Sequence, residues 1–206
     1  MSFVFADKLG EKVSESYNNP YDAIKNLIIK NTNNQNNKLC IVFDNRVIRI
    51  LDTKMILVKW AVSCVKRVLH IFEEHYPDFK RPRKAIEAVS NWIKDPSEKN
   101  RMDCNFSNYY VYSHAVVVAA DFTANAASAS YFVYFVCDAF NAAFCASNAA
   151  PNPSLEIKWQ RKKLNQIVYE EILLVFVMTQ YQRIDKKLIR KIPKELLEYI
   201  ASFITG

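Results

Sequence analysis

The chain has 206 residues, of which 50% are hydrophobic and 24% are charged, and this composition excludes a disordered chain. Its formal net charge of +7 permits an acidic partner without identifying one, because net charge governs non-specific attraction more than any particular site. Only two glycines occur, Gly10 and Gly206, which excludes glycine-rich phosphate loops and disfavours an all-β fold with many tight turns.

Residues 1–52 have the pattern of an extension attached to the main body. The segment NPYDAIKNLIIKN at 19–31 predicts one short helix, because its apolar residues recur at helical spacing. An asparagine-rich, low-complexity loop follows at 31–37. Two apolar runs in KLCIVFDNRVIRIL, at 38–51, then flank an Asp-Asn pair, which predicts a small β-hairpin.

Residues 53–206 predict a helical domain. In KMILVKWAVSCVKRVLHIFEEHYP, at 54–77, the polar residues fall at steps of three and four and form one hydrophilic stripe on a largely buried helix. Pro77 ends this helix. In RPRKAIEAVSNWIKD, at 81–95, the proline occupies the first helical position and the apolar residues lie along one face, which predicts a second amphipathic helix.

Two alanine-rich helices are predicted next, at 108–128 and 130–150. Alanine lets helix backbones approach closely, so this pair belongs at the centre of a bundle. The sequence has no Lys or Arg from 102 to 157, which also indicates core material. A long helix at 154–182 and a short one at 193–205 complete the chain. The expected fold is mainly α, a compact helical bundle with alanine-rich central helices and a small N-terminal β-hairpin.

A membrane span at 131–150 is the alternative for the second alanine-rich segment. Asp138 lies at its middle, Asn141 and Asn148 are close by, and alanine replaces leucine as the dominant residue. A charged residue at the centre of a span costs about 2.5 to 3.5 kcal/mol. We therefore expect a buried helix of a protein without a membrane span.

The sequence offers no recognisable metal, cofactor or catalytic constellation. His70 and His75 are five residues apart and point away from each other on a helix, and no Cys or carboxylate completes a ligand spacing. The N-terminus lacks a secretory signal. The five cysteines form no CxxC pair, and we expect them to be reduced thiols, mostly in the core of a cytoplasmic protein: Cys40, Cys64, Cys104, Cys137 and Cys145.

Two isolated carboxylates stand out, because Asp121 and Asp138 each lie in one of the two alanine-rich helices. A carboxylate in such surroundings should find a partner or line a cavity. A simple arrangement has Arg67 or Arg83 reach one of them, or places both on the bundle surface. The more specific hypothesis is a polar pocket or partner-binding site, formed by Asp121, Asp138, His114, Tyr110 and Tyr134.

Three basic runs, at 80–84, 158–163 and 183–191, raise the question of nucleic-acid binding. The later two are interleaved with apolar residues at helical spacing and are partly matched by nearby acidic residues. This pattern is typical of the solvated face of a helix, so we do not expect a nucleic-acid partner.

The strongest signal in the chain is a block of spaced residues within 60–92. Its order, Trp60-Ala61, Cys64, Arg67-Val68-Leu69, Phe72-Glu73, Pro77, Arg81-Pro82-Arg83, Ala85-Ile86-Glu87-Ala88 and Trp92, resembles the immunity-five-like family of bacterial polymorphic toxin systems. Alanine-rich helices and a late Trp159-Gln160 extend the resemblance over 55–174. The matching residues resemble a structural signature: Trp60, Arg67, Arg81, Arg83, Glu87, Trp92 and Trp159.

The resemblance implies a non-enzymatic protein that neutralises a toxin-like domain by binding it. In the family, the alanine-rich helices tend to carry an arginine and a further histidine, and the alanine-rich helices of this chain contain neither after His114. The alternative is a structural, self-assembling or scaffold protein with the same helical body. Asparagine-rich loops and abundant lysine indicate an AT-rich genome for that case, such as a eukaryotic microbe or a large DNA virus. A weaker resemblance links 191–204 to the opening of an F-box, which binds an adaptor.

Overall fold

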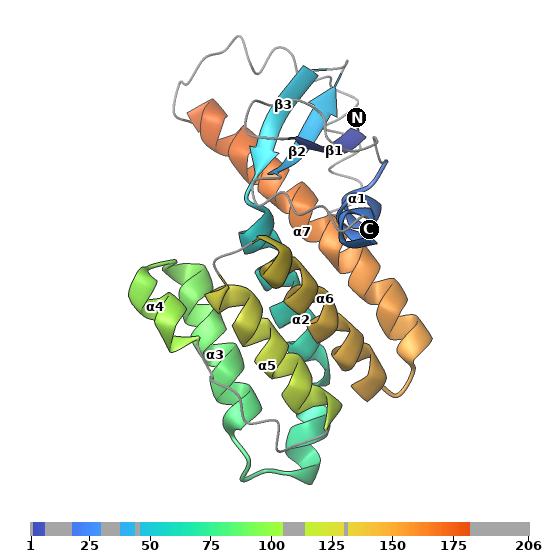
Figure 1. The fold of residues 1–206 in the computed structure, drawn as a ribbon, viewed down its shortest axis with the longest axis vertical. Coiled ribbons are helices and arrows are strands. Elements are labelled where there is room, and N and C mark those ends of the chain that lie inside the picture. The colour runs from blue at the N-terminus through green and yellow to red at the C-terminus, as the bar shows by residue number, and fades with distance from the viewer. Residues whose placement is uncertain are drawn as a thin grey trace.

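The computed structural model describes residues 2–6, 18–29, 38–43, 46–104, 114–129 and 132–181, and this part of the chain is mainly helical (Figure 1). The expected fold class, mainly α, is confirmed. In chain order the elements are β1 (Ser2–Ala6), α1 (Pro20–Ile29), β2 (Lys38–Phe43), β3 (Arg46–Leu51), α2 (Thr53–His75), α3 (Arg81–Lys94), α4 (Glu98–Asp103), α5 (Ala115–Ser128), α6 (Phe132–Ala149) and α7 (Pro153–Tyr181).

Helix α2 is the centre of the bundle and packs against α3, α5, α6 and α7. It begins after Asp52, whose side chain accepts a hydrogen bond from the Met55 N–H at 3.0 Å and so caps the helix. It ends at His75, two residues before Pro77. The predicted hydrophilic stripe is confirmed, since Lys66 and His70 are exposed while the rest of the helix is largely buried.

Helix α3 begins at Arg81, one residue before the predicted start, so Pro82 is its second residue and still lies in the first turn. Its buried residues are Pro82, Ala85, Ile86, Val89 and Trp92, which lie along one face. The opposite face is exposed at Arg83, Lys84, Glu87 and Asn91. A short helix, α4, follows after the N-cap Ser97.

Helices α5 and α6 pack closely together and both lie on α2, in front of it in Figure 1. Alanine makes this packing possible, because its small side chain lets the backbones approach. Helix α5 begins at Ala115, so the predicted start near residue 108 falls among residues outside the described part. The alanines with at most 3% exposure on these helices are Ala119, Ala120, Ala124, Ala126, Ala127, Ala139, Ala142, Ala143 and Ala146.

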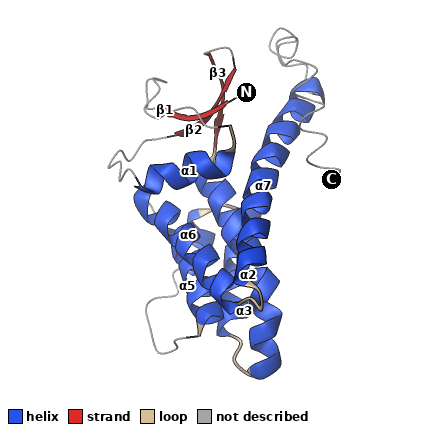
Figure 2. Cartoon of the chain, turned by 90° about the vertical axis from the view of Figure 1, so that its right-hand side faces the viewer, coloured by secondary structure: helices blue, strands red, loops and turns tan. Residues whose placement is uncertain are grey.

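Helix α7 packs on α2 and α6 and extends beyond the bundle, as Figure 2 shows. Its start is capped by Asn152, whose Oδ1 accepts a hydrogen bond from the Leu155 N–H at 3.1 Å. It also contacts α1. The backbone N–H of Tyr21 donates to Oδ1 of Asn165 at 3.1 Å, and the Arg161 guanidinium lies 2.9 Å from a carboxylate oxygen of Asp22. These contacts join the helix of the N-terminal extension to the helical body.

Strands β1, β2 and β3 form an antiparallel sheet in the order β1-β2-β3. The register pairs Phe3 with Ile41 and Cys40 with Ile50, and it is irregular between Ile41 and Val42. The turn between β2 and β3 lies outside the described residues, so the predicted hairpin stays a prediction. The asparagine-rich loop at 31–37 and the helix expected at 193–205 also lie outside them.

The cysteines with described side chains carry free thiols. Cys64 and Cys104 are buried, as expected, whereas Cys137 and Cys145 are only half-buried on α6. Burial raises the pKa of Cys64 well above its usual range and that of Cys104 to about 11. These two thiols are therefore core residues in which burial disfavours the thiolate form.

Candidate functional site

Asp121 on α5 pairs with Arg81 at the start of α3, with 3.0 Å between Oδ2 of Asp121 and Nη2 of Arg81. The sequence indicated a cation partner but pointed to Arg67 or Arg83, which instead pair with Glu156 and Glu73. Burial raises the pKa of Asp121, and the Arg81 charge opposes this shift. The pair fastens α3 to α5, which is a structural use of the carboxylate.

Asp138 on α6 is half-buried and forms no ion pair with a described residue. Burial alone raises the pKa of its carboxyl group to about 6. Asp121 and Asp138 therefore differ: the first is neutralised by an arginine, and the second is partly desolvated without a counter-charge.

His114 is the N-cap of α5, because its Nδ1 accepts a hydrogen bond from the Val116 N–H at 3.3 Å. Its ring packs edge-on against Phe72, with 4.8 Å between the ring centroids, and also contacts Tyr76. Burial, together with the nearby charge of His75, lowers the pKa of His114. This favours the neutral imidazole that the cap requires.

The five residues expected at one pocket come from different places in the fold. His114 begins α5, Asp121 faces α3, and Asp138 and Tyr134 lie one turn apart on α6. Tyr110 lies outside the described residues. A pocket shared by all five stays a prediction, whereas Tyr134 and Asp138 share one helix face.

That face of α6 also carries residues that the sequence analysis did not select as site residues. Phe144 is 64% exposed and Tyr134 is 63% exposed, which makes them the most exposed large hydrophobic side chains of the described part. Asn141 and Asn148 are exposed on the same stripe. The seven-residue spacing of these asparagines was the signal that could have marked the stripe as solvent-facing.

Two signature residues join α2 to α7. Trp60 is buried, and its indole N–H donates to the backbone carbonyl of Gln160 at 2.8 Å. The side-chain amide of Gln160 donates in turn to the Ala143 carbonyl at 2.9 Å, which adds α6 to the connection. Arg67 donates from Nε to buried Glu156 at 2.7 Å and stacks over the ring of Trp159 at 4.5 Å.

Two further signature residues join α3 to α2. Arg83 forms a two-pronged ion pair with Glu73, in which Nε donates to Oε1 at 2.6 Å and Nη2 donates to Oε2. Trp92 is buried, and the ammonium of Lys54 lies 4.9 Å from its ring centroid. Glu87 is the exception, since it is exposed on α3.

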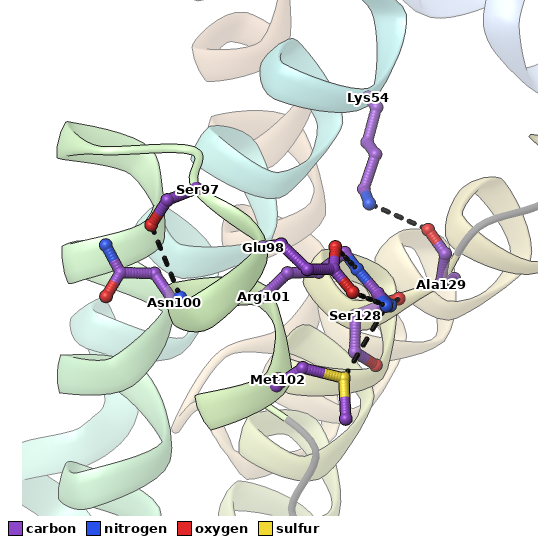
Figure 3. Close-up of polar contacts among 8 residues, drawn as sticks. All are labelled: Lys54, Ser97, Glu98, Asn100, Arg101, Met102, Ser128 and Ala129. Carbon is purple, nitrogen blue, oxygen red and sulfur yellow. Dashed lines mark hydrogen bonds and ion pairs between the residues drawn. The ribbon is translucent and has the colours of Figure 1, made fainter.

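The C-terminus of α5 is held by two cations, as Figure 3 shows. Lys54 donates to the Ala129 carbonyl at 2.7 Å, and Arg101 of α4 donates to the Ser128 carbonyl while pairing with Glu98. Cations at this end complement the helix dipole and satisfy carbonyls that have no partner within the helix. These contacts hold the C-terminal end of α5 against α2 and α4.

Within the part of the chain that the structure describes, no three His, Cys, Asp or Glu side chains lie together as a metal site would require. No described helix is long and apolar enough to cross a membrane. The signature side chains on and around α2, such as Trp60 and Arg67, form contacts between helices.

Among the comparisons with known proteins, one family model matches, over part of the chain. No curated protein and no solved structure matches the chain. The family match does not reach 191–204, so the F-box-like resemblance has no support from it. The resemblance to the immunity-five-like family is confirmed for the first block, which comprises the end of β3, α2, α3 and the start of α4. Residues 50–100 match the family described as "Imm-5 like putative immunity protein".

Proposed function

We propose that this chain is a non-enzymatic binding protein of the immunity type, which acts in the cytoplasm by docking on a toxin-like protein and blocking it. The family match at 50–100 carries this proposal. The structure supports it in one respect, because the signature residues Trp60, Arg67, Arg81, Arg83 and Trp92 are used in contacts between helices. Such a signature preserves a scaffold, and a scaffold that presents a binding surface fits the immunity role.

The first experiment captures partners of the tagged full chain from cells of the organism that encodes it. The expected result is one protein recovered in a stable complex, identified by mass spectrometry. That protein should arrest growth when it is produced alone in a test bacterium, and co-production of this chain should restore growth.

Two results would overturn the proposal. Recovery of the chain alone, in a self-assembled form, would favour a structural or scaffold protein. Recovery of a partner whose toxicity or activity is unchanged by this chain would show binding without immunity. The Trp60→Ala variant serves as a destabilised comparison: it should no longer capture the partner, because loss of the buried indole destabilises the helical scaffold.

A further inference from the structure

The outer surface of α6 has the composition of a protein-binding surface. We call the residues Tyr134, Asp138, Asn141, Phe144 and Asn148 the α6 face. They lie at steps of three, four and seven along the helix and therefore form one stripe. Tyr134, Asn141, Phe144 and Asn148 are exposed, and Asp138 is half-buried between them. Aromatic side chains are enriched in the cores of protein interfaces.

The α6 face is also distinguished by its charge. No Lys or Arg lies between 102 and 157 in the sequence, so the face itself contains no cation. By contrast, cations are exposed on α2, α3 and α7: Lys66, Arg67, Arg83, Lys84, Lys158, Arg161 and Lys162. A chain of net charge +7 therefore presents one helix face whose single charged group is acidic.

Asp138 is exceptional among the described carboxylates. The others that are at least partly buried each have a cation partner: Asp22 with Arg161, Glu73 with Arg83, Asp121 with Arg81, Glu156 with Arg67 and Glu171 with Lys59. Asp138 is half-buried without one. A partly desolvated carboxylate is a favourable place for a cation from another molecule. Folding has already removed part of the water around the carboxylate, so binding has less water left to displace.

The same observation argues against a second copy of this chain as the occupant. Two α6 faces packed against each other would bury two Asp138 carboxylates, and neither face would supply a cation. Burial of charges without a partner is strongly unfavourable. A partner that carries its own cation can form an ion pair with Asp138 and also cover Tyr134 and Phe144.

We propose that the α6 face docks a protein partner that inserts a lysine or arginine side chain beside Asp138 and packs apolar groups against Tyr134 and Phe144. This inference rests on the proposed immunity function and names the surface and the chemistry of its partner. The aromatic side chains contribute the apolar contact, and the carboxylate sets the position of the cation.

The main test measures the affinity of the captured partner for matched variants of the full chain. Asp138→Asn should weaken binding about tenfold or more, and Phe144→Ala should weaken it to a similar extent. Two controls should leave affinity unchanged: Glu74→Gln removes an exposed carboxylate on α2, and Met102→Ala removes an exposed apolar side chain on α4. Unchanged affinity of both α6 variants would overturn this inference while leaving the immunity proposal intact.

A second test needs no captured partner and so decides the inference if the immunity proposal fails. The isotope-labelled chain is titrated with the blocked dipeptide N-acetyl-Trp-Arg-amide and, separately, with N-acetyl-Trp-Glu-amide. The expected result is amide chemical-shift changes centred on 134–148 with the cationic dipeptide, and their loss in Asp138→Asn. Equal responses to both dipeptides, or responses elsewhere only, would overturn the inference.

Sedimentation equilibrium of the chain alone tests the competing occupant. The expected result is a monomer at micromolar concentrations. A dimer that dissociates in Phe144→Ala would overturn the inference in favour of self-association through the α6 face.

Discussion

The surroundings of α2 and the outer face of α6 use similar side chains in opposite ways. Around α2, the indole rings of Trp60 and Trp92 are buried. Each charged signature group except Glu87 pairs with a partner on another helix, as Arg67 and Arg83 illustrate. On α6, the aromatic rings of Tyr134 and Phe144 are exposed, and Asp138 forms no ion pair with any residue that the structure describes. The difference fits our proposal, in which the family signature maintains the scaffold and the docking surface is the α6 face, outside the matched residues 50–100.

The largest effect is expected at Trp60. Replacement of this buried side chain by alanine leaves a cavity and removes the hydrogen bond to Gln160, so the free energy of unfolding should fall by about 3 to 5 kcal/mol. Urea denaturation measures this change. Phe144→Ala on α6 is the control and should change stability by about 0.5 kcal/mol or less, because its side chain is exposed. Equal losses for the two variants would contradict the comparison.

A smaller loss is expected at Arg67. Its removal leaves the carboxylate of Glu156 buried without a cation, and Oε1 of Glu156 already lacks a hydrogen-bond partner. Arg67→Ala should therefore cost about 2 kcal/mol of unfolding free energy, which is less than for a fully buried pair because the guanidinium is half-exposed. The double variant with Glu156→Gln should recover part of that loss. If the loss of unfolding free energy in the double variant equals the sum of the two single losses, Arg67 and Glu156 are not coupled.

Asp138→Asn should act in the opposite direction on stability. The folded pKa near 6 lies above the ordinary value of 3.8, so the folded chain binds more protons than the unfolded chain between these values. Below pH 4 the Asp138 carboxyl is protonated in both the folded and the unfolded chain, and its burial costs little. As pH rises through 6 the buried group must ionise, so the free energy of unfolding falls. The amide variant should gain about 1 kcal/mol at pH 7, allowing for partial solvation, and little at pH 4. Thermal unfolding at both pH values measures this, and a loss at pH 7 would contradict it.

The smallest effect is expected at His114. Its pKa is lowered on folding, so the unfolded chain binds more protons as pH falls below the ordinary 6.5, and the stability that the cap provides is lost there. The cap is worth about 1 kcal/mol. His114→Asn keeps an uncharged acceptor at the cap, and the resulting variant should lose less stability on acidification from pH 7 to 5. Identical pH profiles of the two proteins would show that the cap does not titrate.

The sequence predicted the elements whose signals are local. Periodic apolar residues located α2 and α3, and Pro82 marked the start of α3. Alanine content predicted the close packing of α5 and α6, but the central helix of the bundle is α2 and not this pair. The ion-pair partner of Asp121 could not be predicted from local sequence, because Arg81 lies 40 positions away and meets it only where α3 packs against α5. Several cations at similar spacing were equally plausible, so Arg67 and Arg83 could not be distinguished from Arg81.

The α6 face was harder to predict because the sequence of α6 is apolar on nearly every side. Tyr134 and Asp138 were selected for their chemistry, whereas Phe144 resembled the half-buried aromatic Phe140 nearby. Only the packing separates them: Phe140 contacts Trp60 with 4.9 Å between ring centroids, and Phe144 is exposed. Which aromatic side chain of α6 is exposed depends on how the helix is rotated about its axis, and its packing against α2, α5 and α7 sets that rotation.

Amide hydrogen exchange of the chain with and without its captured partner tests the central claim most directly. The account predicts that binding increases protection within 134–148 of α6 and leaves the exchange of α2 and α3 unchanged. Protection gained on α2 and α3, with α6 unaffected, would contradict it, because the signature helices would then be the binding surface and not its scaffold.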